Sequence, residues 1–166
     1  MQEHYNEVVK CLNQLIRSCK DASAACQQWG YNGHKRMYQT YSLKYMEKFL
    51  YLKKKVFDMF RFMPIDNNAS EPYKPTSYKE HFFHWEKFIK MCIDTLSNLS
   101  KKIYESTGME NCTLNEILHC LYKDYEKVCR EIAIYNESQW HPIELHMIDA
   151  KYHKKFKKKM KERGYK

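Results

Sequence analysis

Acidic and imidazole side chains near the end of the chain are the first candidates for chemistry. His146, Asp149 and His153 are three and four residues apart, a spacing that a helix brings to one side. Asp149 falls inside an apolar stripe that includes Ile148 and Tyr152. An ionised carboxylate in such a stripe must be compensated, because an unpaired buried charge is strongly penalised. A metal ion would compensate it, and so would a Lys or a Tyr hydroxyl, and the sequence leaves both interpretations open.

Other polar side chains fall on or beside apolar stripes when each expected helix is projected at about 100° per residue. Helical bundles build iron and other transition-metal sites from inward-facing Glu, Asp and His. The sequence therefore predicts a site for iron or another transition metal, with these ligands: His81, Glu86, Asp124, Asp149 and His153. The competing interpretation is that isolated polar residues in apolar stripes fix the register of the helices. The one Glu-x-x-His match, Glu116 to His119, falls off its stripe and is expected in solvent.

The seven cysteines form no CxxC pair, and four of them lie on or beside apolar stripes: Cys11, Cys19, Cys26 and Cys92. Buried free cysteines behave as small hydrophobic residues, which is the simpler interpretation. A thiolate-lined core for Cu(I) is the alternative, because soft thiolates prefer that ion.

Basic residues are concentrated in the last part of the chain, which has a formal net charge of +9 in total. The residues expected to follow phosphates of a nucleic acid are Lys154, Lys155, Lys157, Lys158 and Lys159. An anionic membrane surface is a further partner of the same chemistry. The alternative is a solvated helix end whose cations complement the helix dipole.

Composition favours an all-α domain. The 166 residues include only four Gly and four Pro, too few turn-formers for a sandwich of short strands. The start of the chain, Met1 to Glu7, carries acids where a signal peptide needs basic and apolar residues, so a cytoplasmic protein with reduced thiols is expected. No window approaches the uninterrupted apolar length of a membrane span.

Apolar periodicity predicts one helical-bundle domain over 1–166, with four long helices and a C-terminal helix. The expected helices are at about 3–29, 35–62, 78–106, 114–138 and 143–163. Capping-box motifs that begin at Ser77 and Thr113 are expected to cap the third and fourth helices. The loop at 63–77, which contains three prolines, is long enough to cross the bundle, at about 50 Å when extended. A long crossover between the second and third helices is the ferritin-like connection.

Scattered segments resemble an uncharacterised ferritin-like bundle family of bacteria. The segments that carry the likeness are Leu12 to Asp21, Trp85, Leu114 to Glu126, and Pro142 followed by His153. The resemblance implies a ferritin-like bundle. In iron-binding members of that superfamily, two Glu-x-x-His pairs and two further Glu face inward. Here Asp149 and His153 are four residues apart, so the resemblance implies the shape more directly than the chemistry.

Two functions from different classes follow as hypotheses. The first is a cytosolic ferritin-like bundle with a lost or altered di-metal site, acting in structure, storage or stress. The second is a basic module that binds nucleic acid or another polyanion; salt-sensitive binding that is lost with residues 151–166 would distinguish it. An enzyme is the least supported class, because the sequence has no Gly-rich phosphate loop and no HExxH motif. The expected partners are thus a metal ion, nucleic acid, and a second copy of the chain.

Overall fold

The computed structural model describes residues 1–65 and 75–164, which form five helices. Their bounds are α1 Gln2–Gln28, α2 Asn32–Phe60, α3 Tyr78–Thr107, α4 Cys112–Glu137 and α5 Pro142–Glu162. Each expected helix agrees with the observed one to within three residues at either end. The predicted all-α architecture is confirmed.

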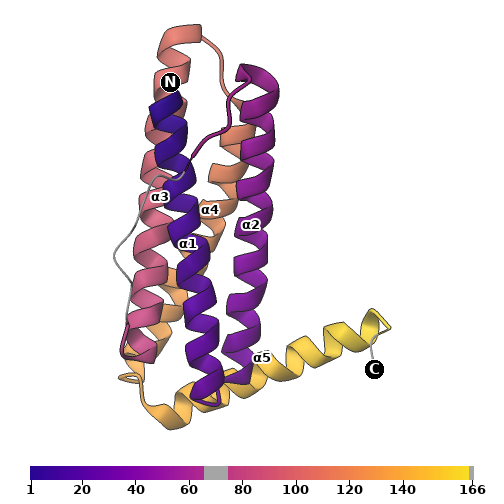
Figure 1. Ribbon diagram of the computed structural model, residues 1–166. Helices are drawn as coiled ribbons and strands as arrows, with labels where there is room; N and C mark the ends of the chain where they lie inside the picture. Colours follow the sequence, from indigo (N-terminus) through magenta and orange to yellow (C-terminus); the bar gives the residue numbers. More distant parts are fainter. Residues whose placement is uncertain (66–74, 165–166) are drawn as a thin grey trace.

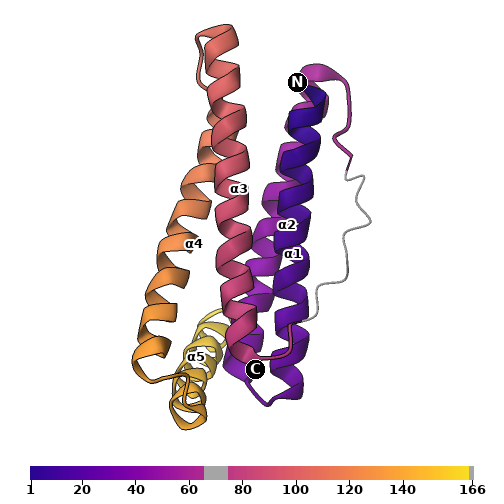
Figure 2. The same ribbon diagram turned by 90° about the vertical axis from the view of Figure 1, so that its left-hand side faces the viewer.

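The first four helices lie side by side and α5 lies across one end of them (Figure 1). The helix α1 packs against α2 and α3, α3 packs against α4, and α2 packs against α5. Contact between α2 and α4 is the least extensive of these interfaces. Figure 2 shows the consequence: α3 and α4 form one pair, α1 and α2 form the other, and α5 passes beneath them.

The connection between α2 and α3 crosses the length of the bundle. Helix α2 ends at one end of the bundle and α3 begins at the other, so both helices run in the same direction (Figure 1). This is the predicted crossover, although residues 66–74 of the predicted loop lie outside the described residues. The connections on either side are turns of a few residues, which can only join antiparallel neighbours.

The apolar stripes meet in a core of large side chains. Leu12, Tyr38, Trp85 and Leu121 come from four different helices, and each is at most 1% exposed. The Trp85 indole N–H donates to the hydroxyl of Tyr45 at 3.2 Å, which satisfies a polar group that burial would otherwise strand. Burial of these stripes is what holds the long helices together, since helix propensity alone is a weak force.

Local capping explains two of the helix starts. The Ser77 hydroxyl accepts from the Glu80 backbone N–H at 3.2 Å, as the predicted capping box requires. At α4 the prediction was wrong: Asn111, not Thr113, is the N-cap, and its side chain accepts from the Leu114 backbone N–H at 3.1 Å. Asparagine is the stronger cap, so the helix begins a residue or two earlier than predicted.

Helix α2 begins without a local cap. Its N-cap residue, Tyr31, offers no side-chain hydrogen bond to the first turn. The first backbone N–H groups of a helix lack partners within the helix and must find them elsewhere. At α2 the partner comes from α5.

Candidate functional site

Asp149 of α5 caps the start of α2 from a distance in sequence. One carboxylate oxygen accepts from the Gly33 backbone N–H at 3.1 Å, and the other accepts from the His34 backbone N–H at 2.7 Å. Asp149 is 5% exposed, which confirms the prediction that it is buried with a partner at hydrogen-bonding distance. The negative charge also lies at the positive end of the α2 dipole.

The side chain of His34 joins the same carboxylate to α4. Its Nδ1 lies 2.7 Å from a carboxylate oxygen of Asp149, and its Nε2 lies 2.9 Å from the hydroxyl of Tyr135. A neutral imidazole satisfies both contacts when Nδ1 donates to the carboxylate and Nε2 accepts from the hydroxyl. His34 is fully buried, so this chain of hydrogen bonds ties α5, α2 and α4 together inside the protein.

The hydrogen bonds decide the ionisation of Asp149. Burial by itself raises the pKa of the carboxyl, but the bonds from the His34 side chain and from the backbone N–H groups of His34 and Gly33 outweigh it. The net effect is a pKa below the ordinary value. Asp149 is therefore a carboxylate at neutral pH, and its charge is already compensated by the protein.

Gly33 allows α5 to approach α2 this closely. A Cβ atom at Gly33 would overlap the backbone carbonyl of Asp149 and would lie 2.9 Å from the backbone nitrogen of His153. Backbone atoms cannot move aside as a side chain can, so any larger residue would separate the two helices. The close approach is what puts the Asp149 carboxylate within reach of the first turn of α2.

A second buried carboxylate, Asp124 of α4, is paired in the same way. Its oxygen accepts from the Lys44 ammonium of α2 at 2.7 Å. A third, Glu131, is 7% exposed and accepts a short hydrogen bond from the hydroxyl of Tyr152 in α5. Burial and the neighbouring Glu131 charge together raise the pKa of the Tyr152 hydroxyl. Glu131 was not among the predicted ligands, although it lies beside the apolar stripe that Val128 and Ile132 define and seven residues after the predicted Asp124.

The other three predicted metal ligands are His81, Glu86 and His153, and each has contacts of its own. His81 is buried in α3 with its ring edge-on to Trp29, at 5.8 Å between ring centroids. Burial, and then the nearby His84, lower the pKa of His81 to about 4. Glu86 accepts from the Cys129 thiol at 3.9 Å, and His153 is partly buried in α5.

The described residues contain no group of three or more His, Cys, Asp or Glu that could hold a metal ion. His81, Asp149 and His153 do not converge in the way a shared metal would require. The two best-placed acids already have protein partners, Asp149 in His34 and Asp124 in Lys44. As arranged in the described parts of the chain, these residues do not fit a di-metal centre.

The four cysteines on the apolar stripes, Cys11, Cys19, Cys26 and Cys92, are buried in the hydrophobic core. Burial raises the pKa of Cys26 to about 12 and raises the pKa values of Cys19 and Cys92 well above their ordinary range. A thiol with a raised pKa stays protonated at neutral pH, whereas soft metals bind the thiolate. Protonated thiols favour the interpretation of these cysteines as core residues over a Cu(I) site.

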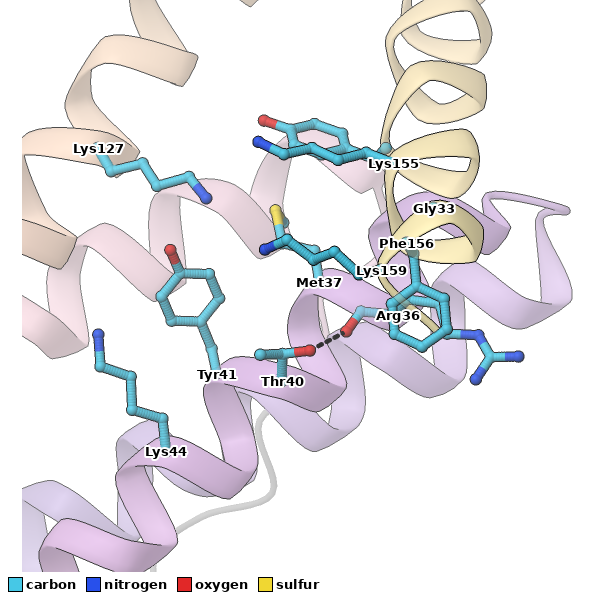
Figure 3. A pocket seen from close by; sticks show the side chains of 11 residues that line it. Gly33, Arg36, Met37, Thr40, Tyr41, Lys44, Lys127, Lys155, Phe156 and Lys159 are labelled. Atoms are coloured by element: carbon cyan, nitrogen blue, oxygen red, sulfur yellow. Dashed lines mark hydrogen bonds between the residues drawn. The ribbon is translucent and has the colours of Figure 1, made fainter. Parts of the chain in front are cut away.

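A cationic pocket opens where α2, α4 and α5 meet (Figure 3). Its volume is about 290 Å³, and no Asp or Glu of the described residues lines it. The cations in its wall are Arg36, Lys44, Lys127, Lys155 and Lys159. The pocket lies at the weak interface between α2 and α4, which α5 closes from one end.

Lysines also cover the outer side of α5. They border an open groove of about 630 Å³, formed by Lys151, Lys154, Lys155, Lys157, Lys158 and Lys161. All six are exposed. The C-terminal end of α5 extends beyond the bundle (Figure 1), and of these six lysines only Lys155 also lines the pocket with α2 and α4.

Comparison with solved structures identifies the fold as ferritin-like. The chain matches the crystal structure of a PmFTN variant soaked in iron for 3 h, with a TM-score of 0.76 and 16% identity over 90% of this chain and 96% of the other. The crystal of the same variant soaked for 45 min gives the same values. No protein-family model and no curated protein matches the chain.

The ferritin-like shape expected from the sequence is thus confirmed. At this level of identity the match defines the fold alone and transfers no ligand. Among the described helices, none has the length and apolar character needed to cross a membrane.

Proposed function

We propose that this protein is a ferritin-like bundle that binds nucleic acid or a similar polyanion through the outer face of α5. The single observation that carries the proposal is the projection of a lysine-covered helix beyond the bundle end. Residues 151–166 contain nine Lys or Arg and one Glu, and so account for most of the formal charge of +9.

Arrangement, and not only composition, supports this proposal. Within the described residues, no ion pair includes a lysine of α5. Cations without local counter-charges produce a strong positive potential, which attracts and orients polyanions. Neutralising phosphates releases their counterions, and this release supplies much of the binding free energy.

The ferritin-like frame has a clear role in the proposal. Asp149 fixes the first half of α5 to the bundle, while the lysine-rich half starts immediately after it. The bundle therefore presents a preformed cationic helix, and binding does not require that helix to fold first. Less ordering on binding means less entropy lost.

The test is a fluorescence anisotropy titration of the full chain with duplex DNA and single-stranded RNA over a range of salt concentrations. The variant replaces Lys154, Lys157 and Lys158 with Gln. A matched control replaces the three lysines at 53–55 with Gln and so removes the same charge. These lysines lie toward the C-terminal end of α2, away from the end that contacts α5.

We expect the α5 variant to bind DNA more weakly and to reduce the salt slope by about 2 to 3, as the loss of three phosphate contacts requires. The control should keep the slope of the unmodified protein. Equal slopes in the two variants would mean that only net charge matters, and would refute a specific role for α5. Absence of binding at low salt would refute the proposal altogether.

Metal binding, the other function predicted from the sequence, would require Asp149 and Asp124 to leave their present partners. Their hydrogen bonds supply the compensation that a cation would otherwise provide. For this reason the geometry favours the polyanion-binding proposal over a storage role that depends on metal.

A further inference from the structure

The pocket between α2, α4 and α5 gathers positive charge from separate helices. Lys127 of α4 and Lys155 and Lys159 of α5 direct their ammonium groups into one space above Tyr41 of α2 (Figure 3). Like charges repel, so side chains brought together in this way raise the potential of the pocket. An anion that enters it would relieve the repulsion.

These three cations have no carboxylate partner in the parts of the chain that the structure describes. Within the described residues, none of Lys127, Lys155 and Lys159 takes part in an ion pair. Lys127 instead lies over two aromatic rings, 5.1 Å from the centroid of Tyr41 and 5.9 Å from that of Tyr152. It is also partly buried, so water compensates its charge less well than at an exposed site.

Each of the two nearby carboxylates has a protein partner at one of its oxygens. Asp124 accepts from Lys44, and Glu131 accepts from the hydroxyl of Tyr152. Lys44 is consequently held at the edge of the pocket, while the ammonium groups of the other lysines remain available to a ligand. Because the carboxylates bind Lys44 and Tyr152 and the other lysines face the pocket, the pocket is suited to an anion and not to a cation.

One wall of the pocket is apolar and held in place. Met37 and Phe156 line it, and the Arg36 guanidinium lies 4.7 Å from the centroid of the Phe156 ring. In Figure 3 that guanidinium points away from the three lysines, so Arg36 supports the wall and does not add to the anion site. An apolar wall beside converging polar groups is typical of small-molecule pockets, whose volumes begin at about 300 Å³.

We propose that this pocket binds a small phosphorylated molecule, with its phosphate groups on Lys127, Lys155 and Lys159 and its organic part on the wall around Phe156. Phosphate matches the site because it carries more than one negative charge and accepts several hydrogen bonds at once. A monovalent carboxylate would neutralise only part of the charge. The site is distinct from the outer face of α5, with which it shares Lys155 alone.

Isothermal titration calorimetry of the full chain tests this proposal with three probes in metal-free buffer: adenosine triphosphate, inorganic pyrophosphate and adenosine. We expect both phosphate compounds to bind and adenosine not to bind. Tighter binding of adenosine triphosphate than of pyrophosphate would support an organic part on the wall around Phe156. Equal binding would refute that part of the proposal and assign the ligand to free phosphates. Absence of phosphate binding, or equal binding of adenosine, would overturn the proposal.

Variants locate the binding. Lys127→Gln should weaken phosphate binding by about tenfold or more, because it removes a charge-assisted contact in a partly buried site. Lys123→Gln, an exposed lysine one turn away on the same helix, is the matched control and should leave the affinity unchanged. Lys159→Gln provides a second variant at an exposed position, in case the first lowers the stability of the fold. Equal affinity in all of these variants would overturn the assignment to this pocket.

Different variants test the pocket and the outer face of α5, so either proposal can be refuted without the other. Lys127 is not among the residues of the outer face, so Lys127→Gln should leave the salt slope for DNA unchanged. Lys158→Gln should reduce that slope and leave pyrophosphate affinity unchanged, because Lys158 does not line the pocket.

Discussion

Replacing Asp149 with Ala removes the acceptor of three hydrogen bonds that join α5 to the start of α2. Loss of a helix cap costs about 1–2 kcal/mol. A buried imidazole N–H left without an acceptor costs about 1–3 kcal/mol. Because one carboxylate serves all three donors, these costs overlap, and we expect the free energy of unfolding to fall by about 2–4 kcal/mol. For a chain of this length, Tm should fall by roughly 5–15 °C.

Urea unfolding followed by far-UV circular dichroism measures the global effect. Native-state amide exchange measures the local one, since the backbone N–H groups of Gly33 and His34 should lose protection in Asp149→Ala. The matched control is Asp94→Ala, the same substitution at an exposed position of α3, which should change stability by no more than about 0.5 kcal/mol. If Asp149→Ala behaved like this control in both measurements, the capping argument would be refuted.

The same substitution has a defined dependence on pH. The folded pKa of Asp149 lies below its ordinary value, so its contribution is present above the unfolded pKa of about 3.9 and is lost as pH falls through the folded pKa. The difference in stability between the unmodified protein and Asp149→Ala should therefore be constant near neutral pH and should shrink below about pH 4. If the stability difference between the two proteins disappeared between pH 7 and about pH 4, the assignment of Asp149 as a carboxylate would be contradicted.

Three further predictions follow from the same structure. Gly33→Ala should lower the free energy of unfolding by about 2 kcal/mol or more, because the methyl group would meet the backbone of α5; urea unfolding should show this, although alanine is ordinarily the better helix former. His81 has a folded pKa of about 4, so the unfolded state binds more protons between about pH 6.5 and pH 4, and stability should fall as pH is lowered through that window. His81→Phe should flatten this dependence in unfolding experiments, and an unchanged dependence would assign it to other groups. Metal binding at the five predicted ligands stays a prediction that metal analysis tests: stoichiometric Fe(II) retained by protein purified without a His tag, and lost in Asp149→Ala, would support it, whereas metal-free protein would contradict it.

Apolar periodicity was sufficient to predict the five helices and their assembly into a bundle. The stripes of α1 and α3 continue without interruption for the length of each helix, and long regular stripes leave little choice of secondary structure. The length of the loop before α3 then determined the crossover, since a short connection cannot return to the other end of the bundle. Helix ends were predicted less accurately, because a cap depends on a single side chain. At α4 that side chain is Asn111 and not the predicted Thr113.

The sequence predicted that Asp149 is buried with a partner, but it did not identify the partner. His34 lies between the Gly-containing turn and the residue at which the second helix was expected to begin, so its position looked like part of a connection. It is separated from Asp149 by 115 residues, and only the packing of α5 across the bundle end brings the two together. A helix start with no Ser, Thr, Asp or Asn at its cap, as at Tyr31, is a signal that an external cap is needed.

The cationic pocket was not predictable from the sequence. Its lysines come from α2, α4 and α5, and Lys127 has the spacing of an ordinary surface residue. Sequence arguments grouped Lys155 and Lys159 with their neighbours in a single basic run. The structure divides that run, because a helix presents successive lysines to different sides: some face the pocket and others face solvent.

This division decides how the basic region should be tested. Deleting residues 151–166 would retain Asp149 but would remove Tyr152, whose hydroxyl binds the buried carboxylate of Glu131. Removing one partner of a buried carboxylate is strongly destabilising, so lost nucleic-acid binding in the deletion would combine a loss of charge with a disturbed bundle. Substitution of Lys154, Lys157 and Lys158 avoids this, because these exposed side chains have no ion pair within the described residues. If the deletion abolished binding while the triple substitution left the salt slope intact, the polyanion surface would have to lie elsewhere on the bundle, and α5 would serve to stabilise it.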